Sequence, residues 1–314
     1  MTRWTAADAA AWLTPPAEAD DKYARGVLGV ATGSVAYPGA AVLGVEAALH
    51  TGVGMIRYVG PEEVGRLVLS QRPEAVLGAG RVNAWVVGSG MVAPAPHHDG
   101  GLRAPGSDDR RGRGPDDDAR RVDEALASRA PVVLDAGAIA RASEAVGPVI
   151  ITPHAGELAT LLDVPRDSVA ADPAGHAHQA SAACGAVVLL KGATTIVARA
   201  ERETRHEGAT IEVREATPWL ATAGAGDALA GILGALVATR AARHGGIAAD
   251  DLVALGATAA FIHGRAARLA ARIVEQDGPH ERRGARAGGH GGGPFTILDL
   301  CAAVPDVVRD LLAP

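Results

Sequence analysis

Short apolar runs rich in Val, Ile and Leu alternate along this chain with longer segments whose apolar residues recur at helical spacing. The runs lie at residues 27–31, 55–59, 84–87, 132–135, 149–152, 187–190 and 196–198. Strands that are apolar throughout and separated by helices are typical of a parallel sheet with helices on both faces. The pattern therefore predicts an α/β fold built around a central, mostly parallel sheet.

Helical patterns between and after these runs complete the prediction. Residues 40–50 and 228–242 are apolar and compatible with helices, and residues 250–272 and 296–312 make the second half of the chain richer in helix. We expect the last of these helices to break at Pro305, because a proline inside a helix removes one backbone hydrogen bond. The two C-terminal helices should pack beside the helix that starts near residue 228.

Two segments differ in composition from the predicted core. Residues 94–121 are crowded with Gly, Pro, Asp and Arg, and residues 276–294 combine charges with a glycine-rich stretch. Neither segment can bury enough apolar area to offset the entropy of ordering it, so we interpret both as flexible insertions in one domain that spans residues 1–314. Histidines in such solvated loops more often bind nothing. We therefore expect no metal site at His97, His98 and His290.

Composition narrows the class of function. The 40 glycines and the aromatic content of 3% favour close packing of helices on the sheet. The formal net charge of −6 gives no positive field to attract nucleic acid or an anionic membrane, and the N-terminal residues lack the apolar core of a secretory signal. No uninterrupted apolar stretch is long enough to span a membrane. Cys184 and Cys301 lie in apolar settings, so we expect reduced thiols in a cytoplasmic protein.

The segment 222–227, Thr-Ala-Gly-Ala-Gly-Asp, is the strongest candidate for chemistry because it precedes an apolar helix. Small residues at a helix start let backbone N–H groups converge on an anion, and the helix dipole favours negative charge there. Asp227 could accept a proton from a substrate hydroxyl while these amides stabilise a transferring phosphoryl group. The predicted anion hole comprises the amides of Ala223, Gly224, Ala225 and Gly226. In isolation the same residues could form only a tight turn and a helix cap.

Two glycine-rich junctions follow earlier runs of the predicted sheet. Gly33 and Gly39 would let a ligand approach the helix that begins at Ala40, and Gly88 and Gly90 form a tight turn after residues 84–87. Parallel sheets bind their ligands beyond the carboxyl ends of the strands. Alone, neither junction distinguishes a binding site from an ordinary connection.

A third junction joins residues 149–152 to a predicted helix. Pro153 suits an early helical position, with Thr152 as the helix cap and Glu157 near the first turn. His154 has no such structural explanation, although a single histidine is usually structural. At the end of a strand its imidazole could form a hydrogen bond with a substrate amide or a ribose hydroxyl.

Lys191 closes the run 187–190 and is followed by Gly192, Ala193, Thr194 and Thr195. A lysine followed by hydroxyl residues offers a charge and hydrogen-bond donors to the phosphates or ribose of a nucleotide. A hairpin turn with an exposed lysine would have the same local sequence. The chain lacks the glycine and lysine spacing of a Walker loop.

Taken in order, these motifs resemble those of the ADP- or ATP-dependent NAD(P)H-hydrate dehydratases, a family of the ribokinase-like superfamily. The resemblance extends from about Lys22 to about Gly264 and resumes in the final helices. It is carried by residues 33–41, 135–136, 152–157, 190–195 and 221–231. It implies a ribokinase-like three-layer α/β/α fold.

The resemblance also implies a reaction. The family phosphorylates NADH or NADPH that is hydrated at carbon six of the nicotinamide ring, and loss of the phosphate restores the ring double bond. By this resemblance Asp227 is the base, and the residues that bind the hydrated cofactor are Ala40, Gly90, His154 and Asp227. The nucleotide would be bound by Lys191, Gly192, Ala193, Thr194, Thr195 and Gly226.

The family further implies a nucleotide co-substrate and an assembly. We expect ADP rather than ATP as the phosphoryl donor, with Mg²⁺ shielding its phosphates. Family members often form tetramers, so a homo-oligomer is expected. Some members carry an N-terminal epimerase domain, and here we expect any epimerase to be a separate chain.

The sequence departs from the family pattern at three places. The family's Gly-Pro-Gly-Leu-Gly appears here with Ser89 and Val92 in place of the proline and the last glycine. The family's Asp-Ala-Asp begins with Asp135 but has Gly137 in place of its second aspartate, and Ala225 replaces a hydroxyl residue. One lost hydroxyl hydrogen bond is worth about 0.5–1.5 kcal/mol, so Ala225 should tune activity rather than abolish it. Two alternatives stay open: a ribokinase-like kinase of a small alcohol whose product keeps the phosphate, and a nucleotide-binding sensor without catalysis.

Overall fold

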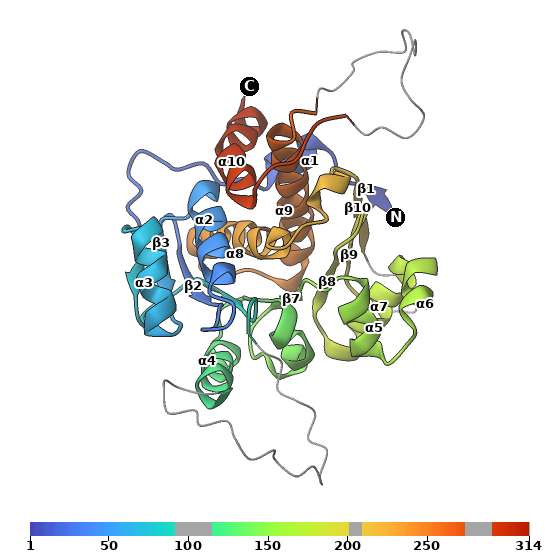
Figure 1. Cartoon of the computed structure of the whole chain (residues 1–314), viewed down its shortest axis with the longest axis horizontal. Helices are drawn as coiled ribbons and strands as arrows, with labels where there is room; N and C mark the ends of the chain where they lie inside the picture. The colour runs from blue at the N-terminus through green and yellow to red at the C-terminus, as the bar shows by residue number, and fades with distance from the viewer. Residues whose placement is uncertain (92–114, 201–208, 274–290, 314) are drawn as a thin grey trace.

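The computed structural model describes residues 1–91, 115–200, 209–273 and 291–313, and within them ten strands form one sheet (Figure 1). The strand order is β1-β10-β9-β8-β7-β6-β5-β2-β3-β4. The bounds are β1 Thr2–Arg3, β2 Val27–Ala31, β3 Met55–Tyr58, β4 Val76–Leu77, β5 Ala84–Val87, β6 Val132–Leu134, β7 Val149–Ile151, β8 Val187–Leu190, β9 Thr195–Ala198 and β10 Thr210–Val213. A strand is therefore present at each predicted run, and three short ones, β1, β4 and β10, were not predicted.

Adjacent strands of this sheet run parallel except in the pairs β8–β9 and β9–β10. The predicted mostly parallel sheet is thus confirmed, and β8 and β9 form a hairpin around Lys191. The parallel strands β2, β5, β6, β7 and β8 end at one common edge. Loops that follow parallel strands at such an edge are where open α/β sheets bind ligands.

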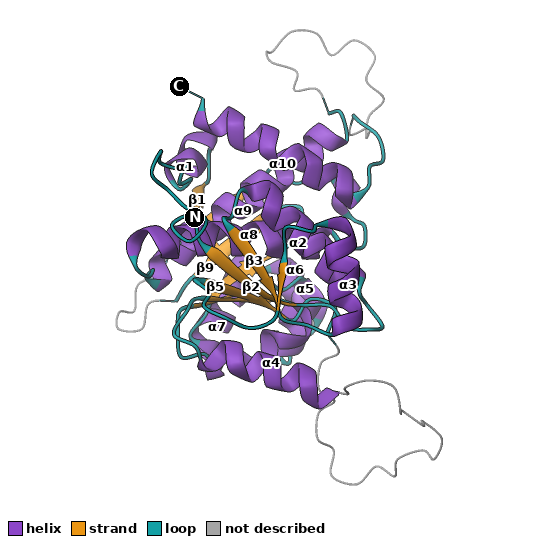
Figure 2. Cartoon of the chain, turned by 90° about the vertical axis from the view of Figure 1, so that its left-hand side faces the viewer, coloured by secondary structure: helices purple, strands orange, loops and turns teal. Residues whose placement is uncertain are grey.

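Helices cover both faces of the sheet, as expected for a three-layer fold (Figure 2). One layer contains α2 Gly39–Thr51, α3 Glu62–Gln71, α8 Ala225–His244, α9 Ala249–Ala270 and α10 Ile297–Leu312. The other contains α4 Pro115–Ala127, the 3₁₀ helix η1 Ala136–Glu144, α5 Ala155–Leu162, α6 Arg166–Ala171 and α7 Pro173–Cys184. The remaining helices are α1 Ala6–Ala11 and the 3₁₀ helix η2 Pro218–Leu220.

Alternation along each central strand divides the core into two clusters. Val86 and Val133 belong to the cluster under α8 and α9, whereas Trp85 and Val132 belong to the cluster under α4 and α7. Successive side chains of a strand point to opposite faces, so a strand buried on both faces must be apolar at every position. This is why the runs were recognisable in the sequence.

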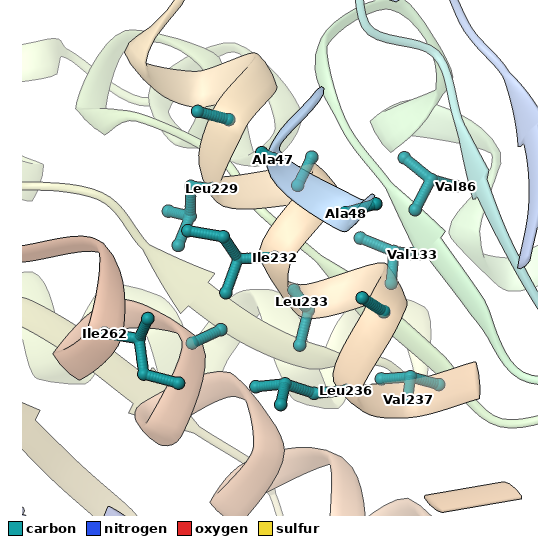
Figure 3. Packing of buried hydrophobic residues seen from close by; sticks show 14 of the residues in the cluster. Ala47, Ala48, Val86, Val133, Leu229, Ile232, Leu233, Leu236, Val237 and Ile262 are labelled. Atoms are coloured by element: carbon teal, nitrogen blue, oxygen red, sulfur yellow. The ribbon is translucent and has the colours of Figure 1, made fainter. Parts of the chain in front are cut away.

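The helix that follows the glycine-rich segment, α8, lies at the centre of the first cluster. Figure 3 shows Ile232 and Leu233 of α8 near Val86 and Val133 of the sheet and Ile262 of α9. A Cβ atom at Gly234 would lie 2.2 Å from the Val86 side chain, so this glycine allows the helix to approach the sheet closely. Tight packing of this kind fixes the position of the helix start at the binding edge.

By length and mean composition α8 could cross a membrane, although glycines, Asp227 and Arg240 interrupt its apolar stretch. However, 72% of its apolar window is buried inside the molecule. The contacts with the sheet, α2 and α9 explain its composition. Both cysteines have free thiols as predicted, with Cys301 buried and Cys184 half-buried, and burial raises the pKa of each thiol.

Two local predictions were wrong. Helix α10 is continuous through Pro305, because Val304 and Val307 on one face are buried and this packing outweighs the local cost of the proline. Residues 115–121, expected to belong to a flexible insertion, form the first part of α4, whose Val122 and Leu126 are buried against the sheet. The other positions of the two expected insertions, except residues 291–294, lie outside the described residues, as do His97, His98 and His290.

Candidate active site

A cavity of about 1210 Å³ lies at the carboxyl ends of β7 and β8. Its wall consists of the residues that follow these two strands, the segment that leads into α8, and one face of α9. The predicted site residues that line it are His154, Lys191, Gly192, Ala193, Thr195, Ala223, Gly224, Ala225, Gly226 and Asp227. The structure therefore brings together motifs that are far apart in the sequence.

Asp135 is a buried carboxylate that connects the strand ends around this site. It directly follows β6 and is only 3% exposed. Its carboxylate accepts hydrogen bonds from Ser89 Oγ at 2.8 Å and Thr152 Oγ1 at 2.7 Å, and it forms an ion pair with Lys191 Nζ at 2.9 Å. A carboxylate buried this deeply needs such partners to offset its desolvation. The network fixes the ends of four neighbouring strands relative to one another.

Lys191 connects this carboxylate to the start of α8. Its backbone N–H donates to the carbonyl of Pro153 at 2.8 Å, and its ammonium lies 3.8 Å from the carboxylate of Glu157. A Cβ atom at Gly226 would lie 3.3 Å from Lys191 Nζ. The ammonium is therefore held beside the first turn of α8, where a positive charge adds to the dipole of the helix.

Glycine at position 224 sets the geometry of that helix start. Gly224 precedes α8 in a left-handed conformation with φ of +89°, and a Cβ atom there would lie 2.5 Å from the Leu43 side chain. No side chain caps the helix. The amide of Ala225 makes a long hydrogen bond of 3.5 Å to the carbonyl of Thr222, whereas the amides of Ala223 and Gly226 have no partner among the described residues. Uncapped amides at a helix N-terminus suit an anion.

Asp227 lies in the first turn of α8 and is half-buried. Burial raises the pKa of its carboxyl to about 6, and the negative charge of Asp135 contributes in the same direction, while Lys191 opposes the shift. A general base works best when its pKa lies near the pH of the reaction. Asp227 therefore lines the cavity with a carboxyl whose pKa lies in the range that suits a general base.

His154 both caps a helix and lines the cavity. It is the N-cap of α5: its Nδ1 accepts hydrogen bonds from the amides of Gly156 at 3.0 Å and Glu157 at 3.1 Å, and Glu157 accepts in return from the backbone of His154 at 2.8 Å. This corrects the prediction that Thr152 caps the helix, because Thr152 donates to Asp135 instead. The imidazole is also exposed on the cavity wall, with 60% of its side chain accessible.

Three predicted site residues lie apart from the cavity wall. Ala40, in the first turn of α2, lies next to Gly90, which follows β5, and a Cβ atom at Gly90 would lie 2.6 Å from that of Ala40. Thr194, in the hairpin between β8 and β9, is also outside the lining residues. Gly90 has φ of +68°, which favours glycine at this turn. These residues share the binding edge of the sheet without bordering the large cavity.

A family model described as NAD(P)H-hydrate dehydratase matches residues 28–277, which is most of the chain. The chain belongs to the NAD(P)H-hydrate dehydratase family. The resemblance stated from the sequence motifs is thereby confirmed.

Relatives with named activities agree with this family. The chain is 36% identical over 247 residues to the bifunctional NAD(P)H-hydrate repair enzyme Nnr of Mycobacterium tuberculosis, covering 74% of this chain and 45% of that protein. It is 34% identical over 232 residues to the ADP-dependent (S)-NAD(P)H-hydrate dehydratase of Xanthomonas campestris, covering 71% of this chain and 76% of that one. The chain thus spans less than half the length of its bifunctional relative.

A solved structure shares the fold. The ADP/ATP-dependent NAD(P)H-hydrate dehydratase of Bacillus subtilis, co-crystallised with ATP and Mg²⁺, superposes with a TM-score of 0.75 at 23% sequence identity. The match covers 99% of this chain and 98% of that one. At this identity the comparison shows only that this chain has the same fold as the Bacillus subtilis protein.

Two features of the site in this chain were not predicted from its sequence. Asp135 was noted only as part of a motif, although its ion pair with Lys191 organises the edge of the sheet. His263 of α9 also lines the cavity, and burial lowers its pKa to about 4. The apolar pattern around His263 marks a core helix and gives no signal of a ligand contact. Within the described residues, no group of three or more His, Cys, Asp or Glu side chains could hold a metal ion.

Proposed function

We propose that this protein repairs hydrated NADH and NADPH by an ADP-dependent dehydration. Membership of the dehydratase family supports the reaction, and the name of the Xanthomonas campestris relative supports ADP as the co-substrate. The observation that carries the proposal is the position of Asp227, a half-buried carboxyl with a pKa of about 6 beside uncapped amides and the ammonium of Lys191. This arrangement combines a base with a site for a transferring phosphoryl group.

Each step of the reaction has a residue suited to it. Asp227 accepts the proton of the ring hydroxyl while that oxygen attacks the terminal phosphorus of ADP, and AMP leaves. The amides of Ala223, Gly224, Ala225 and Gly226 stabilise the charge on the transferring group. The carbon–oxygen bond then breaks, phosphate departs with its electron pair, and loss of a ring proton restores the double bond. A phosphate ester is a better leaving group than hydroxide, which is why a kinase-like site serves a dehydration.

We assign the two ligands to different parts of the binding edge. Lys191, beside the start of α8, suits the phosphates of the nucleotide, together with Gly192, Ala193, Thr194, Thr195 and Gly226. The hydrated cofactor would be bound by Ala40, Gly90, His154 and Asp227. These residues lie at the same edge, in the first turn of α2, after β5, after β7 and in α8, respectively. Asp227 contacts both ligands in this arrangement.

Mg²⁺ is the expected counterion of the nucleotide. The Bacillus subtilis protein was co-crystallised with ATP and Mg²⁺. In the described part of this chain the carboxylate of Asp135 is engaged by Ser89, Thr152 and Lys191, and no cluster of three ligand side chains is present. The chemistry of Mg²⁺ allows it to remain largely hydrated and to bind mainly to phosphate oxygens. Bound Mg²⁺ would shield the negative charge of those phosphates.

One incubation tests the proposed function. Purified protein is mixed with hydrated NADH and ADP, and the absorbance of the reduced nicotinamide is followed while phosphate and AMP are measured. Recovery of the absorbance with equimolar AMP and phosphate is the expected result. A stable phosphate ester without recovery would instead indicate a kinase of an alcohol, and absence of any turnover would indicate a nucleotide-binding sensor. The cytoplasmic location, the homo-oligomeric state, including a tetramer, and the separate epimerase stay predictions.

A further inference from the structure

An exposed arginine of α6 borders the cavity. Arg166, the first residue of α6, lines the cavity together with His154 and Lys191. Its guanidinium has no hydrogen bond and no ion pair with any other described residue. Asp163 and Asp167, the acidic residues nearest to it along the chain, do not line the cavity. The guanidinium is therefore available to a ligand.

The position of α6 is fixed by the core and by the turn that precedes the helix. Val169, three residues after Arg166, is fully buried in the cluster under α4 and α7. Before the helix, the amide of Val164 donates a hydrogen bond to the carbonyl of Ala159 in α5 at 3.0 Å. Figure 1 shows α6 beside α5 and α7. Arg166 thus reaches the cavity from an element whose backbone is held in place.

The charges around the cavity indicate what this arginine can add. Lys191 forms an ion pair with Asp135 at 2.9 Å and lies 3.8 Å from Glu157, so nearby carboxylates already compensate its ammonium. Asp227 adds another acid to the cavity wall. A nucleoside diphosphate or a dinucleotide carries several negative charges near pH 7, and an unpaired charge is costly to remove from water. Such a ligand therefore needs positive charge besides that of Lys191.

The charged side chains that line the cavity in the described part of the chain are Arg166, Lys191, Asp227 and Arg268. Arg268 of α9 already takes part in another interaction. Arg166 is thus the lining cation, among these residues, whose charge has no partner. A guanidinium presents a planar set of donors that can bind two oxygens of one phosphate. Arg166 therefore has both the charge and the donor geometry that a phosphate group requires.

We propose that Arg166 binds a phosphate group of the ligand that occupies this cavity. The inference rests on the proposed function, because it requires a nucleotide or a dinucleotide at this edge of the sheet. The group belongs to the diphosphate of ADP, to the diphosphate of the hydrated cofactor, or to the 2′-phosphate of its NADPH form. The contact adds α6 to a site otherwise formed by strand ends, the start of α8 and one face of α9.

Calorimetric titration of the whole chain measures this contact. Wild type, Arg166→Ala and Arg166→Lys are titrated with ADP, NADH, NADPH and adenosine, which has no phosphate. We expect Arg166→Ala to bind the contacted ligand about 5- to 30-fold more weakly, between the effect of an exposed ion pair and that of a charged hydrogen bond. Arg166→Lys should recover part of the affinity, because lysine keeps the charge but not the planar donors. Adenosine should bind all these proteins alike.

Arg129→Ala is the matched control. Arg129 is exposed, its side chain has no hydrogen bond or ion pair within the described ranges, and it precedes β6 at the end of the sheet opposite the cavity. This variant should bind every ligand as wild type does. The loss caused by Arg166→Ala should also shrink when the salt concentration rises from about 0.02 M to about 0.5 M, because mobile ions screen an exposed charge.

The ligand that loses affinity identifies the phosphate group. A loss confined to ADP assigns Arg166 to the nucleotide, a loss for both NADH and NADPH to the diphosphate of the cofactor, and a loss for NADPH alone to the 2′-phosphate. If every ligand binds Arg166→Ala as tightly as Arg129→Ala, or if adenosine is weakened as much as the phosphorylated ligands, the inference is wrong while the proposed function stands. Absence of binding of ADP and both dinucleotides by wild type would refute the proposed function together with this inference.

Discussion

Replacing Asp227 by asparagine should remove activity and, above pH 6, stabilise the fold. Asparagine keeps the size of the side chain but can neither accept a proton nor carry the charge that burial disfavours. General-base catalysis contributes about 10²- to 10⁴-fold, so kcat should fall by that factor. The same substitution removes the cost of ionising a carboxyl in a largely buried position.

The size of the stabilisation follows from the shift in pKa. Asp227 has a pKa of about 6 in the folded protein against 3.8 for the free side chain. A folded-state pKa raised in an acid means that the folded protein holds the proton more tightly than the unfolded chain, so wild-type stability falls as pH rises from about 4 to about 6. Two units correspond to about 3 kcal/mol, which we reduce to about 2 kcal/mol because Asp227 retains some solvent contact.

Two measurements test this reasoning. Thermal or urea unfolding of wild type and Asp227→Asn at several pH values should show the variant more stable above about pH 6 and equal to wild type near pH 4. The kcat/KM of wild type for hydrated NADH should fall on the acidic side of about pH 6, and the residual rate of the variant should lack this limb. Asp310→Asn, an exposed carboxyl of α10 outside the cavity wall, serves as the control. Turnover by Asp227→Asn within tenfold of wild type would remove the proposed base.

Three substitutions around the helix start give further expectations. Lys191→Ala should raise the KM for ADP more than that for the hydrated cofactor in steady-state assays, and an unchanged ADP dependence would exclude Lys191 from the nucleotide site. Gly226→Ala introduces a Cβ atom 3.3 Å from Lys191 Nζ, so ADP should bind several-fold more weakly by calorimetry without a large change in melting temperature; unaltered affinity would contradict the placement of the ammonium. Ala225→Ser adds a hydroxyl at the helix start and should raise kcat/KM for ADP by about 2- to 12-fold, whereas a loss would show that the hydroxyl is not accommodated there.

Burial on both faces made most of the sheet predictable from sequence. The central strands are apolar at every position, because Val86 and Trp85 are neighbours that face different clusters. Strands β1 and β4 lie at the two ends of the sheet, and each has only 2 residues, too few for a recognisable apolar run. Strand β10, Thr210–Val213, next to β1, is only partly buried. Strands at or near an edge of the sheet depend on their partners and not on a pattern of their own.

Predictions of helix ends from the local sequence were wrong where contacts with other elements outweigh the local preference. Thr152 has the sequence context of a helix cap, but its hydroxyl donates to Asp135, seventeen residues earlier in the chain, and His154 takes the capping position. The proline in α10 is a second case, since burial of Val304 and Val307 outweighs the local preference for a break. In each case the competing partner comes from another element, which the spacing of residues along the chain does not reveal.

The same reason explains why the ion pair at the centre of the site was not predicted. Asp135 and Lys191 are 56 residues apart and meet only because β6, β7 and β8 are neighbours in the sheet. A nucleotide site requires positive charge, yet positive charge would lower the pKa of the base beside it. Here burial of Asp227 and the negative charge of Asp135 both oppose the effect of Lys191, so the pKa stays near 6 while the ammonium remains available to phosphate. In the function proposed above, the pair would serve both requirements, and its two members would act together with Asp227.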